Sequence, residues 1–296
     1  MPSETPIQEI DVTNIESIPK IVDELRKIFT SGRTRPLEWR LEQLNATQRL
    51  IEENEGVLKA ALAADMGKPD MEAHITAIAY MLSEIALYRK NLKSWMTPEK
   101  VSTPIAVQPG QSRIHREPLG VVLILGAWNY PFQLVMSPFL GAIAAGNCVV
   151  IKPSEVAAHT SELLARLIPK YLDNKCIRVV EGAVPEATAL LNERFDHIFY
   201  TGNGKVGRIV MTAAAKHLTP VTLELGGQCP AIIDKDIDLE VSIRRIVWGK
   251  FFNAGQTCVA PNHLLVHDAM YDKVLETLKT VLQEFYGDDP SQSPDF

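Results

Sequence analysis

An uncharged stretch between Glu117 and Lys152 constrains the fold more than any other part of the sequence. It is long enough for a helix that crosses a bilayer, which needs about 20 apolar residues. Turn-forming residues interrupt it, however, and a lipid-exposed turn would leave backbone groups without hydrogen-bond partners. These residues are Gly126, Asn129, Pro131, Gln133, Pro138, Gly146 and Asn147. The stretch therefore predicts strand, turn, helix, turn and strand in a buried core, and no transmembrane segment.

Strand-like and helix-like segments alternate from Leu119 onward with short connections. Such alternation is typical of a parallel sheet covered by helices on both faces. The expected strands are 121–125, 148–151, 177–180, 197–200, 221–225, 232–233 and 264–266, and the expected helices are 134–145, 164–172, 206–214, 243–248 and 274–285. With right-handed crossovers, this order predicts an α/β fold with a doubly wound parallel sheet.

The segments on either side of this pattern differ from it. The first hundred residues predict helices, including one that starts near Pro69 and buries an apolar face over 75–86. Residues 101–118 lack a helical period and predict an extended arm or a strand pair. The tail from Gly287 to Phe296 is polar and predicts a loop or turn, with nothing in it that would cap a fold.

Charge and cysteine usage exclude several classes of function. The 296 residues carry 30 Lys and Arg against 36 Asp and Glu, and the net charge of −6 has the wrong sign for neutralising nucleic-acid phosphates. Cys148, Cys176, Cys229 and Cys258 are 28, 53 and 29 residues apart, which matches neither a metal cradle nor a disulfide framework. Three acidic residues up to Asp11 argue against a secretory or transit peptide. We expect no metal, no nucleic-acid partner and a cytoplasmic location.

The strand expected at 197–200 leads into Gly202–Gly207, whose sequence is Gly-Asn-Gly-Lys-Val-Gly, and then into a helix. This is the G-x-G-x-x-G pattern, in which glycines let backbone amides approach a diphosphate at a helix N-terminus. A tight strand-to-helix turn that needs glycine for its own geometry would give the same pattern. It is not a Walker loop, because Arg208 stands where the lysine is required.

A second candidate for phosphate or ribose binding is the sequence Lys152-Pro153-Ser154-Glu155. It follows the strand expected at 148–151, and ligands of open α/β sheets lie beyond the carboxyl ends of the strands. A lysine and a glutamate there could reach phosphate and ribose hydroxyls. The alternative is a solvated ion pair at a helix start that Ser154 caps.

Cys258 and Glu224 are the candidates for nucleophile and base. Cys258 ends the loop-like sequence Gly-Gln-Thr-Cys after an expected helix. A free thiol with a pKa of about 8.5 is mostly protonated at neutral pH, so a catalytic cysteine needs a base, cation or dipole nearby. Glu224 lies between leucines at a strand end, where desolvation would raise the pKa of its carboxyl. The alternatives for Glu224 are a paired edge-strand residue or, 17 residues after Gly207, the ribose-binding acid of a dinucleotide site.

Five motifs in a fixed order make the chain resemble the aldehyde dehydrogenase superfamily, and the sequences at 216–227 and 248–261 are most similar to its class 3 branch. The resemblance covers the chain from about Leu25 to its end. The motifs are Trp128-Asn129-Tyr130-Pro131, Lys152-Pro153-Ser154-Glu155, Tyr200-Thr201-Gly202-Asn203, Leu223-Glu224-Leu225-Gly226-Gly227 and Gly255-Gln256-Thr257-Cys258.

The resemblance implies a role for each motif. Cys258 would attack the aldehyde carbonyl, and the oxyanion of the thiohemiacetal would be held by the Asn129 amide and the Cys258 backbone N–H. Hydride would pass to NAD or NADP, and water activated by Glu224 would release the acid from the thioester. Lys152 and Glu155 would bind the adenosine ribose. The implied cofactor-binding residues are Trp128, Lys152, Glu155, Gly202, Asn203, Val206 and Gly207, and Gly204 would be dispensable.

The resemblance also implies domains, substrates and partners. Residues 1–100 would be helices of the cofactor domain, 101–118 an arm used in oligomerisation, 119–222 the Rossmann-like NAD(P)-binding domain and 223–296 an incomplete catalytic domain. The expected substrates are medium- or long-chain aliphatic or aromatic aldehydes, and the full-length protein would be a homodimer. Glu155 would repel a 2′-phosphate, but class 3 relatives often accept both cofactors.

The chain departs from the family pattern in two places. Gln228-Cys229 follows Gly227, where the family usually has lysine and a small polar residue. The Glu-x-Phe motif that grips the nicotinamide-side ribose does not follow Cys258, so we expect a chain truncated at its C-terminus. Two alternative functions follow: a truncated or split form that binds cofactor or a partner subunit without catalysis, and an acylating enzyme that uses coenzyme A. Glu224 disfavours the latter, because its carboxylate suits hydrolysis.

Overall fold

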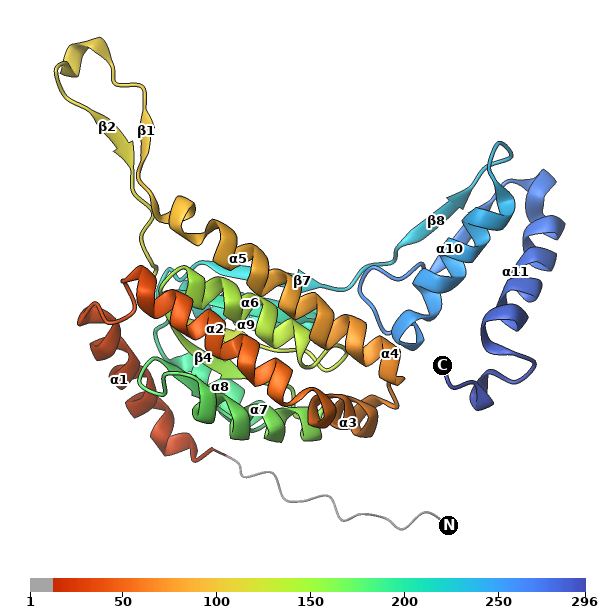
Figure 1. Cartoon of the computed structure of the whole chain (residues 1–296), viewed down its shortest axis with the longest axis horizontal. Coiled ribbons are helices and arrows are strands. Elements are labelled where there is room, and N and C mark those ends of the chain that lie inside the picture. The colour runs from red at the N-terminus through yellow and green to blue at the C-terminus, as the bar shows by residue number, and fades with distance from the viewer. Residues whose placement is uncertain (1–12) are drawn as a thin grey trace.

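The computed structural model describes residues 13–296, so the acidic residues considered at the N-terminus lie outside the described part. A large α/β unit leads through its last strand into a smaller C-terminal unit (Figure 1). The helices are α1 (Ile18–Thr30), α2 (Leu37–Glu53), α3 (Glu55–Met66), α4 (Asp70–Ala73), α5 (Tyr80–Met96), α6 (Gln133–Ala144), α7 (Ala158–Tyr171), α8 (Val184–Asn192), α9 (Gly204–Ala215), α10 (Leu239–Phe251) and α11 (Tyr271–Tyr286). The strands are β1 (Glu99–Val101), β2 (Ser112–Ile114), β3 (Val121–Leu125), β4 (Cys148–Lys152), β5 (Ile177–Val179), β6 (His197–Gly202), β7 (Val221–Leu225), β8 (Pro230–Ile233) and β9 (His263–Val266).

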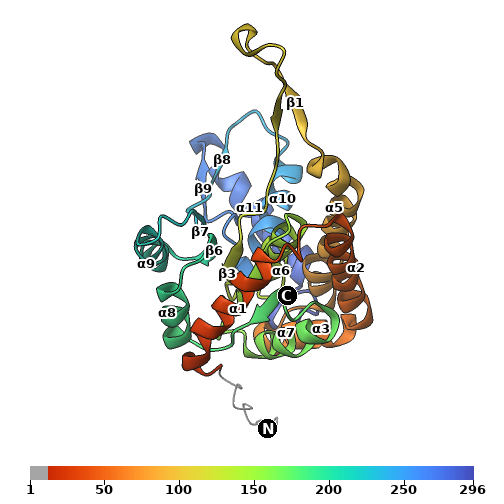
Figure 2. The same cartoon turned by 90° about the vertical axis from the view of Figure 1, so that its left-hand side faces the viewer.

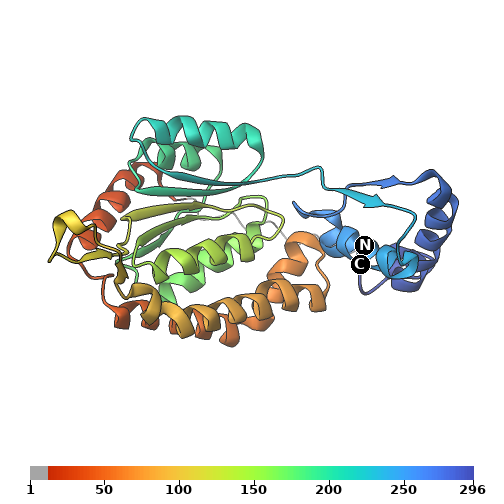
Figure 3. The same ribbon diagram turned by 90° about the horizontal axis from the view of Figure 1, so that it is seen from above.

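The large unit is a five-stranded parallel sheet in the order β5-β4-β3-β6-β7. Helices α6 and α7 cover one face, with α2, α3 and α5 as a second layer behind them, and α1, α8 and α9 cover the other (Figure 3). Every residue of β3 and β4 is buried, because these central strands have helices on both faces. The predicted doubly wound α/β fold is confirmed.

The uncharged stretch forms β3, α6 and β4, as its turn residues predict. Gly126 ends β3 where a Cβ would lie 2.4 Å from Val135 Cγ2, so only glycine allows the chain to turn into α6 at this point. Phe132 and Phe139 from this stretch are completely buried. Within residues 13–296, no helix combines the length and the apolarity needed to span a membrane.

The C-terminal unit is a parallel pair, β8 and β9, with α10 and α11 packed together beside it. Both strands and both helices were expected from the sequence. The tail is a loop with one short turn, as predicted, and its last residue packs on the unit: the Phe296 ring lies 5.4 Å from the Tyr286 ring and 6.2 Å from the Phe251 ring, measured between centroids. A short turn at Pro290–Gln292 directs the tail back onto α10 and α11.

Two local features differ from the sequence-based expectation. The nine-residue helix α8 was not predicted, because it is too short to show a clear apolar period. The helix expected over 75–86 is divided into α4, a π-helical segment at His74–Ala79 and α5. Short π-helical segments are frequent at functional sites.

Residues 99–114 form an arm that projects from the large unit (Figures 1 and 2). Strands β1 and β2 pair in antiparallel register, with Glu99 opposite Ile114. Ile105 at the tip is 92% exposed. The segment is therefore a strand pair, and its role in oligomerisation stays a prediction.

Candidate active site

The motif residues gather at one edge of the sheet, because β3, β4, β6 and β7 end there. Leu125 on β3 pairs with Lys152 on β4 and with Tyr200 on β6, and Thr201 pairs with Glu224 on β7. Successive crossovers leave in opposite directions from β3 and β6, which makes this edge a topological switch point. Ligands of open α/β sheets bind at such points.

Lys152 and Glu155 form an ion pair at the end of β4. Lys152 is only 5% exposed, and its Nζ donates to Glu155 Oε2 at 2.8 Å and to the Pro153 carbonyl at 3.1 Å. Burial acts to raise the pKa of Glu155, but the hydrogen bond and the charge of Lys152 outweigh it and hold that pKa below its usual value. The Glu155 carboxyl is therefore ionised at neutral pH.

The alternative of a solvated pair capped by Ser154 is wrong on both points. Lys152 is buried, and α7 begins only at Ala158. The cap comes from α3: the Asp65 carboxylate accepts from the backbone N–H groups of His159 at 2.9 Å and Thr160 at 2.8 Å. The carboxylate reaches these groups because α3 packs against α7, which the sequence alone did not indicate.

The Gly202–Gly207 segment forms the junction of β6 and α9. Asn203 caps the helix, with its Oδ1 accepting from the Val206 N–H at 3.0 Å. A Cβ on Gly207 would lie 3.3 Å from Leu225 Cδ2, so this glycine lets α9 pack closely on β7. A Cβ on Gly204 would meet only a flexible arginine side chain at 3.5 Å. The structure therefore requires glycine at 207 and not at 204.

A groove of about 340 Å³ lies between α8 and α9, and no residue of the Gly202–Gly207 segment lines it. Small-molecule sites usually have volumes of roughly 300–1,000 Å³. Sequence reasoning missed this groove because it missed α8. Its lining residues are Thr188, Leu191, Asn192, Arg208, Ile209, Thr212, Ala213 and Lys216.

The loop that carries Cys258 docks on the loop that follows β3. Asn129 Nδ2 donates to the Gln256 carbonyl at 2.9 Å. The hydroxyls of Tyr130 and Thr257 are 2.6 Å apart and share a hydrogen bond. Two motifs more than a hundred residues apart in the sequence are thus joined, and the two residues that precede the candidate nucleophile contact the loop of the candidate oxyanion donor.

A left-handed turn at the end of α10 brings the Cys258 loop into this position. Asn253, Ala254 and Gly255 have φ angles of 55°, 51° and 77°. A non-glycine residue in this region costs about 1–2 kcal/mol, so the turn needs support from its surroundings. Asn253 is 4% exposed, and its backbone N–H donates to Glu72 Oε2 at 3.0 Å. Neither Asn253 nor Glu72 was among the predicted site residues.

Glu72 and its neighbour Lys68 are ionisable groups at the base of this loop. Burial raises the pKa of Glu72, against the lowering effects of the Asn253 N–H and the Lys68 charge. Burial lowers the pKa of Lys68 to about 8, with Glu72 acting in the opposite direction. The Lys68 ammonium lies 4.3 Å from the centroid of the Tyr130 ring. A cation over an aromatic face is stabilised by the ring quadrupole.

Glu224 lies at the end of β7 but is exposed, so the expected desolvation of its carboxyl is wrong. The physical reason is its position: β7 is the edge strand, and its end residues Glu224 and Leu225 are both exposed. Cys258 is exposed as well, whereas Cys148 and Cys176 are buried. Of the four thiols, Cys258 is the one most open to a substrate.

The turn after Glu224 lies against the nucleophile segment. A Cβ on Gly227 would be 3.1 Å from the Cys258 carbonyl oxygen, so no larger residue fits without movement. The Cys229 thiol donates to the same carbonyl at 3.1 Å. The family departure at Gln228-Cys229 therefore adds a second thiol in contact with the Cys258 backbone.

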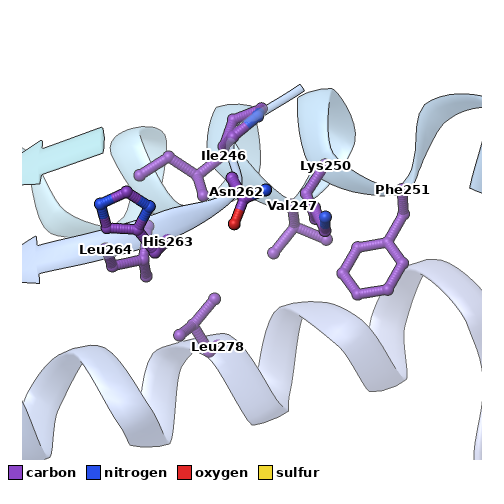
Figure 4. A pocket seen from close by; sticks show the side chains of 9 residues that line it. Ile246, Val247, Lys250, Phe251, Asn262, His263, Leu264 and Leu278 are labelled. Carbon is purple, nitrogen blue, oxygen red and sulfur yellow. The ribbon is translucent and has the colours of Figure 1, made fainter. Parts of the chain in front are cut away.

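A second, smaller pocket lies inside the C-terminal unit, between α10, α11 and the start of β9 (Figure 4). Its volume is about 110 Å³, and Ile246, Val247, Phe251 and Leu278 form much of its wall. This is well below the roughly 300 Å³ of typical ligand sites. We therefore regard it as a gap in the packing of two helices and not as part of the site.

Comparison of the sequence with known protein families assigns the chain to one of them. The sequence model of the aldehyde dehydrogenase family matches residues 2–295. The chain therefore belongs to the aldehyde dehydrogenase family, and the predicted family is confirmed.

Particular relatives narrow this assignment. The chain is 51% identical over 282 residues to the dimeric NADP-preferring aldehyde dehydrogenase of Rattus norvegicus, covering 95% of this chain and 62% of the relative. It is 49% identical over 275 residues to aldehyde dehydrogenase family 3 member A2 of Macaca fascicularis, covering 93% and 57%. The substrate-bound structure of Staphylococcus aureus AldH superposes with a TM-score of 0.92 at 41% identity, covering 96% of this chain and 62% of that one. These relatives confirm the class 3 resemblance, and the chain spans about three-fifths of their length.

Proposed function

We propose that this chain carries the cofactor site and the nucleophile of an NAD(P)-dependent aldehyde dehydrogenase that oxidises aldehydes to carboxylic acids. One observation carries the proposal: the Cys258 loop is hydrogen-bonded to Asn129 at the sheet edge that also holds the Lys152–Glu155 pair. A nucleophile, an amide donor and a polar ribose site thus meet at the switch point of a doubly wound sheet.

Cys258 is the nucleophile in this proposal. Its thiolate attacks the aldehyde carbonyl carbon and forms a thiohemiacetal, whose oxygen carries the negative charge. One N–H of the Asn129 amide is used on the Gln256 carbonyl, which leaves the second for this oxygen, together with the Cys258 backbone N–H. Each such donor is worth roughly 3 kcal/mol in the transition state.

The residues at the sheet edge fit NAD or NADP. Lys152 and Glu155 would hold the adenosine ribose, and the start of α9, which Asn203 caps, would hold the diphosphate. When bound, the nicotinamide accepts the hydride. The exposed Glu224 carboxylate would then direct a water to the Cys258 thioester. The proposed cofactor residues are Trp128, Lys152, Glu155, Gly202, Asn203, Val206 and Gly207.

Substrate, assembly and location follow from the same proposal. Medium- or long-chain aliphatic and aromatic aldehydes are the proposed substrates. The proposed assembly of the full-length protein is a homodimer, in keeping with the dimeric state in the name of the rat relative. The β1–β2 arm, with its exposed Ile105, is the proposed contact between subunits. Four free thiols favour a cytoplasmic location.

Steady-state reduction of NAD and of NADP with an aliphatic aldehyde tests the proposal. We expect Cys258→Ala to abolish turnover while cofactor binding is retained, and Asn129→Ala to lower kcat on the order of 100-fold. Cys148→Ser, a thiol change in the buried β4, is the control for loss of a cysteine. Cofactor binding without any turnover that depends on Cys258 would contradict the proposal and support a non-catalytic form. Acyl-coenzyme A as the main product would support an acylating enzyme.

A further inference from the structure

A carboxylate from the N-terminal helices contacts the nucleophile loop and has no role in the chemistry proposed above. Glu72 lies in α4, and its Oε2 accepts the backbone N–H of Asn253 at 3.0 Å, across 181 residues of sequence. Lys68, just before α4, is 5% exposed, and its ammonium lies 4.3 Å from the centroid of the Tyr130 ring. The Tyr130 hydroxyl in turn shares a hydrogen bond with Thr257 of the loop. Polar groups from distant parts of the sequence therefore contact the loop.

Asn253 connects Glu72 to both parts of the site. Its Nδ2 donates to the Asn129 carbonyl at 2.9 Å and to the Gln256 carbonyl at 3.2 Å. Gln256 closes the ring of contacts, because its Nε2 donates to the Asn253 carbonyl at 3.2 Å. A continuous set of hydrogen bonds thus runs from Glu72 through Asn253 to the oxyanion donor and to the residue two positions before Cys258.

This network supports backbone that is otherwise unfavourable. Asn253 and Ala254 are non-glycine residues with left-handed φ angles, and such conformations persist only where the surroundings hold them. The Asn253 N–H is buried with its residue, so without Glu72 it would lack a partner. The backbone at Glu72 is part of the same helical turn as the π-helical segment that follows α4, because its carbonyl accepts from the Thr76 hydroxyl at 2.7 Å.

We propose that Glu72 is a positioning residue, which holds the left-handed turn at Asn253 and thereby places Cys258 against Asn129. The proposal deepens the function proposed above and rests on it for the role of Cys258. Glu72 does not touch the reacting atoms in this proposal and acts only through Asn253.

Two substitutions of similar size separate the hydrogen bond from the bulk of the side chain. Glu72→Gln keeps an acceptor oxygen, whereas Glu72→Met fills the same space without one, and both residues favour a helix. Asp65→Leu is the matched control, because Asp65 also accepts backbone N–H groups from another element of the helical layer, at α7 and away from the loop. Amide hydrogen exchange of the full chain, read by mass spectrometry, measures the protection of each segment.

We expect Glu72→Met to speed amide exchange over residues 253–258 at least about tenfold, because the buried N–H loses its partner. Exchange of the same residues in Glu72→Gln should stay within about threefold of the unchanged chain. Asp65→Leu should speed exchange at residues 159–160 only. In aldehyde oxidation we expect kcat to fall about tenfold in Glu72→Met with the KM for NAD unchanged, and to recover in Glu72→Gln. Unchanged exchange over 253–258 in Glu72→Met would overturn the proposal, as would equal loss in both Glu72 variants. If the unchanged chain shows no turnover but Glu72→Met still loses protection there, the proposed function fails and the positioning role stands.

Discussion

The two units of the chain solve the problem of burying a parallel sheet in different ways. The large unit places helices on both faces of five strands, so its central strands are buried completely. The C-terminal unit has only β8 and β9, whose paired residues Ile232 and Leu265 are 77% and 52% exposed. Its core consists of six buried hydrophobic residues: Ile233, Ile243, Val247, Met270, Val274 and Val281.

Because the two cores differ, different contacts hold the two parts of the site in place. The proposed cofactor-binding residues follow strands of the five-stranded sheet, whose side chains are part of the large hydrophobic core. The Cys258 loop belongs to the unit with the small core and is held by contacts with the large unit at Asn129 and Glu72. The nucleophile therefore depends on the junction between the units more than on its own unit.

The largest expected difference between the two units is the loss of unfolding free energy when a core side chain is shortened. Phe139→Ala, in the fully buried face of α6, should cost about 3–5 kcal/mol of unfolding free energy, because it leaves a large cavity under the sheet. Val281→Ala in α11 should cost about 2 kcal/mol, since it removes only two methyl groups from the smaller core. Urea titration with hydrogen exchange read in each unit measures both. Equal costs would contradict the contrast between the cores.

Lys68, at the junction between the two units, should make the free energy of unfolding depend on pH. Burial lowers the pKa of Lys68 from 10.5 to about 8, so between these values the unfolded chain binds more protons than the folded one, and stability rises with pH. Lys68→Met removes this dependence. The stability of Lys68→Met relative to the unchanged chain should therefore fall by roughly 3 kcal/mol from pH 7.5 to 10.5. A constant difference across this range would show that Lys68 is not a charged, buried group at neutral pH.

One ion pair in each unit gives a further test. Asp196 accepts from the Val121 backbone N–H at 2.8 Å and from Arg26 at 2.9 Å, so Asp196→Ala should cost about 2 kcal/mol by leaving the N–H at the start of β3 without this partner. Arg244 joins α10 to Glu284 on α11 at the surface. Arg244→Ala should have no measurable effect, because solvent screens such pairs. Thermal unfolding of the two variants provides the comparison, and a large loss in Arg244→Ala would contradict it.

Two glycines of α9 should show the smallest effects, with opposite signs. Gly204→Ala should stabilise the chain by about 0.5–1 kcal/mol, because the site is open and alanine restricts the unfolded chain. Gly207→Ala should destabilise it by about 1 kcal/mol, because its Cβ would press on Leu225. Cofactor titration should show weaker binding only in Gly207→Ala. Stabilisation by both substitutions would mean that α9 does not need close packing on β7.

The sequence predicted the strands better than the contacts between them. The bounds of β3 and β7 agree with the predicted 121–125 and 221–225, because β-branched residues in a short apolar run mark a buried strand. The helix α8 and the groove beside it were missed, since nine residues carry little periodicity. The sequence offered Ser154 only as an alternative cap close to the start of α7, whereas Asp65 reaches that start from α3.

The same distinction holds at the site. The order of the five motifs already indicated the family and the residue types of the chemistry, because these signals are local and depend on the spacing of a few residues. The exposure of Glu224 depends on β7 being the edge strand, and the support of Cys258 by Glu72 and Asn253 depends on two segments 181 residues apart. Such contacts leave no period in the chain. Only packing decides them, because burial and hydrogen-bond partners are properties of neighbours in space.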